Sequence, residues 1–158
     1  MQAIGKPASW VFHVDAEGEY VVAVPDGATT HRGDSGHSLI VRDARTVVAV
    51  AWFAAPDPVD EEPYLEEYVD LVVSSLPRSA ERIHRREIAA ALFPAREVRY
   101  ADGFYDRVVR VSLVPGRLYV QSIGLPSFDS YGPEIRAFFD SFTPFVDCPT
   151  PATPAPEG

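Results

Sequence analysis

The sequence predicts an α+β domain in which a mostly antiparallel sheet of about six to eight strands is packed by two amphipathic helices. Apolar and polar residues alternate from Arg107 to Leu113, as in a half-buried β-strand. Pro115-Gly116 follows and favours a tight turn, because Pro presets the first central residue and Gly accepts a positive φ at the second. The last segment has one apolar face at helical spacing, formed by Ile135, Phe138, Phe139 and Phe142.

The N-terminal half is expected to contain two pairs of strands. The first pair is Trp10 to Val14 with Tyr20 to Val24, joined by a turn at Glu17-Gly18-Glu19, and the second is Ser38 to Arg42 with Thr46 to Ala54. The polar stretch from Thr29 to Gly36 is interpreted as a loop. The stretch from Val47 to Phe53 is apolar throughout, which predicts a strand that is covered on both faces.

A helix is predicted in the middle of the chain. Acidic residues 60–62 precede Pro63, and both features are favourable in a first helical turn. Pro77 is expected to end the helix. Its apolar stripe comprises Leu65, Tyr68, Val69, Val72 and Leu76.

The C-terminal half is expected to contain four more strands before the last helix. One strand is predicted from Ile83 to about Ala91. Two others, Glu97 to Tyr100 and Tyr105 to Val114, flank Asp102-Gly103, which is a strong signal for a two-residue hairpin. Leu118 to Ile123 is the return strand after Pro115-Gly116.

The domain organisation follows from length and composition. Residues 1–8 are expected to be a short leader, residues 9–145 a single α+β domain, and residues 146–158 a disordered Pro/Thr-rich tail. The single cysteine, Cys148, cannot form an internal disulfide. No apolar run resembles a signal peptide or a membrane span, so a cytoplasmic location is expected, with an exported form that has lost its leader left open.

The charge balance bears on the class of partner. The chain carries 23 acidic residues against 14 Lys and Arg, a formal net charge of −9 at pH 7. Because nucleic-acid binding depends on cationic side chains that neutralise phosphates, this balance argues against a nucleic-acid partner. It argues equally against anionic lipid surfaces and favours solubility and a basic partner, and a protein partner is expected.

Three short motifs support a family resemblance. They are an opening strand and turn (Trp10-Val11-Phe12, Gly18-Glu19-Tyr20 and Val24-Pro25), a return strand (Gly116-Arg117-Leu118-Tyr119), and a helix end (Phe138-Phe139-Asp140-Ser141-Phe142). With the order of elements, these motifs resemble the Mog1/PsbP-like family, in particular its small bacterial members, over roughly residues 10 to 143.

The resemblance implies an α/β/α sandwich and a role in binding. The family comprises binding and assembly modules: photosystem accessory subunits, a partner of a small GTPase, and chaperones for secreted bacterial effectors. It has no shared catalytic constellation, so no residue here inherits a catalytic role. The sequence departs from many bacterial members, which are lipoproteins, because no export signal is present.

Two pairs of residues are candidates for partner contact. Phe128 and Tyr131 fall in a predicted loop, where large apolar side chains contact partners or cap the core beneath. Arg82 and Arg86 belong to a basic run and would share a strand face with His84. The arginines suit an acidic peptide or a phosphate, although a charged edge strand, or pairing with the acidic helix, accounts for them more simply.

No catalytic, cofactor-binding or metal-binding residue is predicted. His31, Asp34 and His37 could ligate a divalent metal, but a Gly-containing loop gives them no fixed geometry, so a solvated turn is favoured. Glu66 and Asp70, one helical turn apart, lack the burial that would make them an acid–base pair.

The functional hypothesis is a non-enzymatic binding or assembly module that acts as a chaperone or accessory factor for a protein partner. The alternative is a small-molecule or lipid carrier with a pocket between the sheet and the C-terminal helix. A weak metal-dependent enzyme using His31, Asp34 and His37 is the third hypothesis. The sequence indicates neither the oligomeric state nor the identity of the partner.

Overall fold

A computed structural model describes residues 10–33, 37–43, 45–88, 93–126 and 132–145. The predicted leader and tail, residues 1–8 and 146–158, lie outside the described residues. In chain order the elements are β1 (Trp10–Asp15), β2 (Tyr20–Pro25), β3 (Thr29–Arg32), β4 (Ser38–Arg42), β5 (Val47–Ala54), α1 (Glu61–Ser74), β6 (Glu81–Glu87), β7 (Ala95–Ala101), β8 (Asp106–Val114), β9 (Arg117–Leu125), α2 (Gly132–Ser141) and β10 (Thr143–Pro144).

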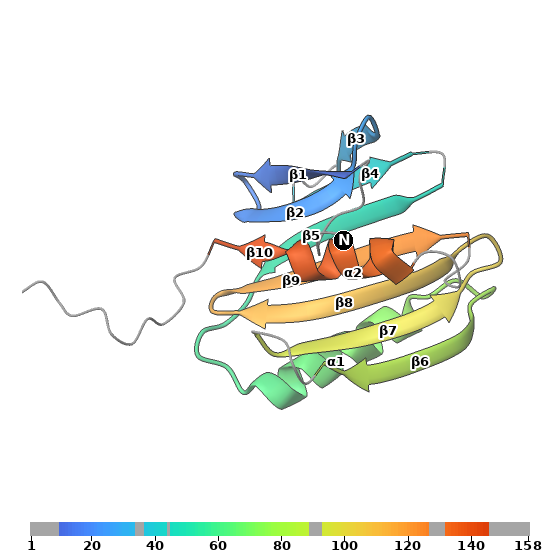
Figure 1. Ribbon diagram of the computed structural model, residues 1–158. Helices are drawn as coiled ribbons and strands as arrows, with labels where there is room; N and C mark the ends of the chain where they lie inside the picture. The colour runs from blue at the N-terminus through green and yellow to red at the C-terminus, as the bar shows by residue number, and fades with distance from the viewer. Residues whose placement is uncertain (1–9, 34–36, 44, 89–92, 127–131, 146–158) are drawn as a thin grey trace, which may run out of the picture.

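The strands form two antiparallel sheets. The large sheet has seven strands in the order β3-β4-β5-β9-β8-β7-β6, and the small sheet has the order β1-β2-β10 (Figure 1). Each hairpin joins neighbours, as expected for strands linked by tight turns. The turn between β8 and β9 contains Gly116 with a φ of 82°, so the predicted turn is confirmed.

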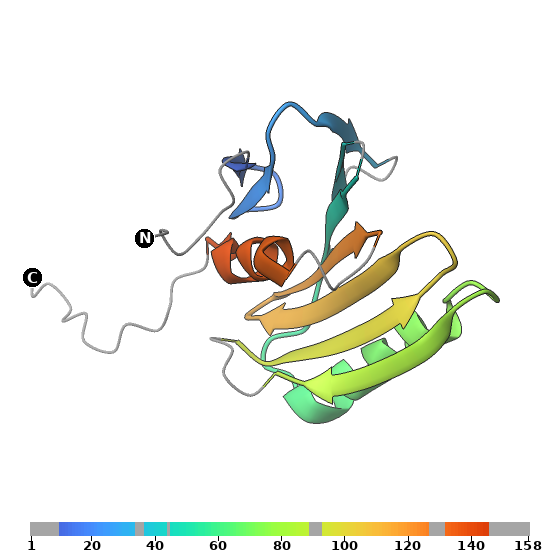
Figure 2. The ribbon, with the colours of Figure 1, turned by 45° about the vertical axis from the view of Figure 1, so that its right-hand side comes forward.

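The layers confirm the predicted α+β sandwich. Helix α1 contacts β7 and β8 on one face of the large sheet, whereas α2 lies on the opposite face beside the small sheet (Figure 2). The larger apolar core lies between α2, the small sheet and the large sheet, and the smaller core lies under α1. Alternate residues of β8 and β9 therefore face different cores, which is the alternation that the sequence showed.

Helix α2 buries the face that was predicted. Ile135, Phe138 and Phe139 are buried, and Phe142 follows the last helical residue. The Phe142 ring packs 5.0 Å from the ring centre of Tyr119. Burial of such side chains is worth about 1.5–3 kcal/mol each, so this stripe is the main reason that α2 docks on the sheet.

Helix α1 begins one residue after its N-cap, Asp60, and ends at Ser74, two residues before the predicted end of its apolar stripe. Leu65 and Val69 are its buried residues. The Ser75 hydroxyl donates to the Leu71 carbonyl, which satisfies one of the terminal acceptors. Within the part of the chain that is described, neither helix is long and apolar enough to cross a membrane.

Two expectations for the N-terminal half were wrong. Residues 29–32 form strand β3 rather than a loop, because they pair with β4 at the sheet edge, where polar side chains carry no apolar signal. Strand β5 is fully covered on one face only: Val48, Val50 and Trp52 are buried, whereas on the other face Val47 is buried but Phe53 is 44% exposed. The reason is that α1 lies over β7 and β8 and leaves that face of β5 partly open.

Two expectations for the C-terminal half also needed correction. The β7–β8 connection has four residues rather than two, since Ala101 pairs with Asp106. The Asp102 carboxylate accepts hydrogen bonds from the backbone N–H groups of Phe104 and Tyr105, which stabilises this longer turn. Strand β6 begins two residues earlier than predicted and ends at Glu87, before residues 89–92, which are not described.

Candidate binding groove

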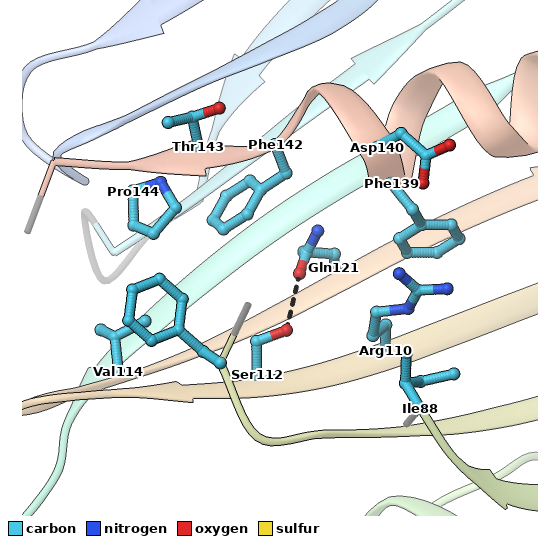
Figure 3. A pocket seen from close by; sticks show the side chains of 11 residues that line it. Ile88, Arg110, Ser112, Val114, Gln121, Phe139, Asp140, Phe142, Thr143 and Pro144 are labelled. Atoms are coloured by element: carbon cyan, nitrogen blue, oxygen red, sulfur yellow. Dashed lines mark hydrogen bonds between the residues drawn. The ribbon is translucent and has the colours of Figure 1, made fainter. Parts of the chain in front are cut away.

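A cavity of about 470 Å³ lies between α2 and the large sheet (Figure 3). Strands β8 and β9 provide its floor, and α2 with β10 provides its opposite wall. The lining residues are Ile88, Phe93, Arg110, Ser112, Val114, Gln121, Phe139, Asp140, Phe142, Thr143 and Pro144. This cavity exists because the β8 side chains that face α2 become polar at Arg110 and Ser112, so the apolar core does not extend there.

The floor of this cavity carries three polar side chains. Gln121 is 1% exposed, and its Oε1 accepts a hydrogen bond from Ser112 Oγ at 3.1 Å (Figure 3). The Arg110 guanidinium lies beneath the Phe139 ring, 4.4 Å from its centre. A few placed polar groups within an aromatic lining are typical of binding sites.

A second cavity, of about 430 Å³, adjoins the first. Its lining comprises Pro56, Asp57, Pro58, Val59, Glu61, Phe93, Pro94, Leu113, Val114 and Pro115. Phe93 and Val114 line both cavities. Because Val114 is the last residue of β8, the two cavities border each other near the end of that strand. We call the two cavities together the Phe93 groove.

A buried carboxylate lies on the same sheet face as the first cavity. The Glu97 side chain is fully buried and accepts hydrogen bonds from three arginines: Arg86 Nε at 3.0 Å, Arg99 Nε at 2.8 Å and Arg110 Nη2 at 2.9 Å. Burial by itself would raise the pKa of Glu97, but the hydrogen bonds from Arg99 and Arg110 outweigh it and lower that pKa below its usual value. Glu97 is therefore ionised near neutral pH.

The two basic candidates from the sequence lie on strand β6. Arg86 belongs to the Glu97 cluster, and its side chain is 59% exposed. Arg82 has a φ of 55° and forms an ion pair with Asp106 at 3.6 Å. A register shift between Glu81 and His84 interrupts the strand alternation that was expected to place Arg82, His84 and Arg86 on one face.

The position of β6 agrees with the simpler interpretation of this basic run, which is that its charges protect a sheet edge or pair with the acidic helix. Strand β6 is one of the two edge strands of the large sheet, and all seven of its residues are exposed. Arg85 forms an ion pair with Asp70 of α1 at 2.5 Å. Charged side chains on an edge discourage pairing with another chain, and the structure has this arrangement.

The other candidates are only partly described. Phe128 and Tyr131 lie outside the described residues, as does Asp34. His31 and His37 are exposed, and the His37 ring lies 6.3 Å from the Trp52 ring. Among the residues that the structure describes, no group of three His, Cys, Asp or Glu side chains could hold a metal ion.

Sequence reasoning missed the residues that shape the groove. Arg110 and Ser112 were recognised as polar members of an alternating strand, a pattern that usually marks a solvent-exposed face. In the structure α2 covers that face and leaves the cavity over them. Glu97 carried no separate signal, because a single acid in a short strand is ordinary in sequence terms.

The layers and strand order define the class of protein: this chain has a Mog1/PsbP-like fold, as the sequence resemblance predicted. It is similar to the solution structure of cyanobacterial PsbP (CyanoP) from Synechocystis sp. PCC 6803, with a TM-score of 0.59 and 14% sequence identity. The similarity covers 91% of this chain and 96% of CyanoP. At this identity the likeness shows the fold alone. No family model and no curated protein matches the sequence.

Proposed function

We propose that this protein is a non-enzymatic binding module that holds an extended segment of a protein partner in the Phe93 groove. The observation that carries the proposal is that the two cavities share Phe93 and Val114 as lining residues. An extended chain can follow both cavities around the end of β8, whereas a compact ligand would fill one of them. Extended segments commonly bind in grooves of this kind through apolar side chains.

The lining of the groove supports a binding role. Phe93, Phe139 and Phe142 supply aromatic surface, and Gln121 supplies a buried polar group at the floor. Aromatic residues give large contact areas at a low entropic cost, which makes them frequent in binding surfaces. The family that the sequence resembles consists of binding and assembly modules, which is consistent with this role.

The polar groups of the groove are poorly arranged for catalysis. Ser112 Oγ donates its hydrogen bond to the Gln121 amide oxygen, which cannot act as a general base. The nearby Glu97 carboxylate has a lowered pKa and is occupied by three arginines, so it is a weak proton acceptor. These contacts support a non-enzymatic function for the described part of the site.

A carrier of a small apolar molecule is the second candidate function. It is favoured by the first cavity, whose volume of about 470 Å³ is within the range of small-molecule sites and which lies between the sheet and the C-terminal helix. The metal-dependent enzyme using His31, Asp34 and His37 remains the weakest hypothesis. Zinc titration of the His31→Ala, His37→Ala double variant against the unaltered protein tests it.

Peptide selection tests the main proposal. A random-peptide display library is panned against the protein, and selected peptides are measured for affinity with two variants. Ser112→Trp places an indole in the first cavity, whereas Ser122→Trp places one on the other face of the sheet and serves as the matched control. We expect at least a tenfold loss of affinity with Ser112→Trp and less than a twofold loss with Ser122→Trp. Circular dichroism and thermal melting confirm that both variants fold.

Two results would contradict the proposal. One is the selection of peptides that bind both variants equally well, because the groove would then not be the binding site. The other is a small molecule of defined mass that co-purifies with the protein in native mass spectrometry and is absent from Ser112→Trp. That result favours the carrier.

A further inference from the structure

We infer that the Phe93 groove recognises a peptide segment with an acidic side chain next to an apolar one, and that Arg110 is the residue that binds the acid. This inference rests on the proposed function and adds the chemistry of the partner. It depends on the unused hydrogen-bonding capacity of Arg110, on the charge around it, and on the different charge at the other end of the groove.

Arg110 has hydrogen-bonding capacity that the described residues do not use. Its Nη2 donates to Glu97, but its Nε is buried and has no acceptor among the residues described. Leaving a buried donor without a partner is unfavourable. Because the Arg110 side chain is 17% exposed and lines the first cavity, an oxygen atom of an occupant can approach the guanidinium from there.

The charge around Arg110 favours an anion. Three arginines share the Glu97 carboxylate, and the Asp140 carboxylate also lines the cavity. These five groups together carry one positive charge, although the whole chain has a net charge of −9. The Arg86 and Arg99 side chains are more exposed than Arg110, at 59% and 36% against 17%, so Arg110 is the most desolvated donor.

Aromatic surface lies beside this donor. The Phe139 ring stacks on the guanidinium, and Phe142 and Val114 belong to the same lining (Figure 3). Val114 also lines the second cavity. An apolar side chain next to the acid would contact this surface while the carboxylate reaches Arg110. A single remaining positive charge matches a carboxylate better than a phosphate dianion.

The opposite end of the groove has the opposite charge. Asp57 and Glu61 line the second cavity, where no arginine or lysine is among the described lining residues. A second acid on the partner would be repelled there, while a neutral or basic residue would be accepted. The groove therefore specifies a direction for the occupant, with its acid at the Arg110 end.

Two matched fluorescent probes test this inference. N-dansyl-phenylalanine has a carboxylate next to an aromatic side chain, and N-dansyl-phenylalanine amide is the same molecule without the charge. Affinities are measured by dansyl fluorescence with the unaltered protein, Arg110→Met and Arg86→Met. Arg86→Met is the matched control, because it also removes one hydrogen bond to Glu97 but alters no residue that lines the groove.

We expect Arg110→Met to weaken binding of the acid probe about tenfold, as for the loss of a charge-assisted hydrogen bond. Binding of the amide probe should change less than twofold, and Arg86→Met should change neither affinity by more than twofold. Equal affinities of the unaltered protein for both probes would overturn the inference, as would equal losses in the two variants or failure of both probes to bind. The peptide selection with Ser112→Trp then decides separately whether the proposed function survives.

Discussion

Arg110 of β8 donates a hydrogen bond from Nη2 to the fully buried carboxylate of Glu97 on β7, at 2.9 Å. The same carboxylate accepts bonds from Arg86 on β6 and Arg99 on β7. Glu97 therefore links three neighbouring strands and fixes the guanidinium that lines the groove. Fold stability and the geometry of the proposed binding site thus depend on the same side chain.

Glu97→Gln should lower the free energy of unfolding by about 3 kcal/mol, because three arginines lose the charge that compensates them. Urea denaturation at pH 7 measures this change. Glu87→Gln is the control: Glu87 is 64% exposed, and its nearest cation, Arg96, lies 3.9 Å away. It should change the free energy by about 0.5 kcal/mol or less. Equal effects of the two substitutions would show that the Glu97 cluster adds no stability.

Stability should fall in acid. The pKa of Glu97 is lowered from 4.5 in the folded protein despite its burial, because Arg99 and Arg110 donate to its charged form. The unfolded chain therefore binds more protons as pH decreases, so the contribution of Glu97 is fully present above about pH 4.5 and is lost as pH falls through its folded pKa. Urea denaturation between pH 7 and pH 3 should show a shallower decline for Glu97→Gln. Parallel pH profiles would contradict this assignment.

Asp102 should be more important than Phe104 in the turn between β7 and β8. The Asp102 carboxylate accepts from two backbone N–H groups and from Arg107 Nε, so Asp102→Ala should cost about 1–2 kcal/mol. Phe104 is 85% exposed, and Phe104→Ser should change stability by about 0.5 kcal/mol or less. Thermal melting compares the two variants. A larger loss for Phe104→Ser would mean that its ring is covered in solution.

Arg96 should anchor α1 to the sheet. Its side chain is 7% exposed, its Nε donates to Glu66 at 2.9 Å, and its Nη2 donates to Glu62. Arg96→Met should lower the free energy of unfolding by about 1–3 kcal/mol, because the two carboxylates lose their shared cation. It should also speed hydrogen exchange in α1 more than in α2. The exposed Arg136, replaced in the same way, provides the control, and equal exchange in both helices would contradict the anchor.

The sequence predicted correctly those features of the fold that depend on residues close together in the chain. The stripe of Ile135, Phe138 and Phe139 and the turn at Gly116 are local, and both were predicted correctly. Strand β3 was missed because an edge strand needs no apolar pattern. The four-residue turn was missed because a side chain, that of Asp102, stabilises it beyond what Asp-Gly usually implies.

Local sequence patterns could not predict the groove, because contacts between residues far apart in the chain form it. Arg110 and Glu97 are 13 positions apart, and Ser112 and Gln121 are 9 apart, so their contacts depend on which strands become neighbours and in what register. The polar face of β8 looked like a surface in the sequence. Only the docking of α2 over it made it the floor of a cavity.

By itself, the sequence determined the helices, most of the strands and the layered α+β class, because periodicity and turn chemistry act within a few residues. The tertiary structure decided which polar side chains were buried, which arginines share Glu97, and where the two cavities meet. These features arise from contacts between distant segments, whose energies depend on packing and on a local dielectric that no single segment determines.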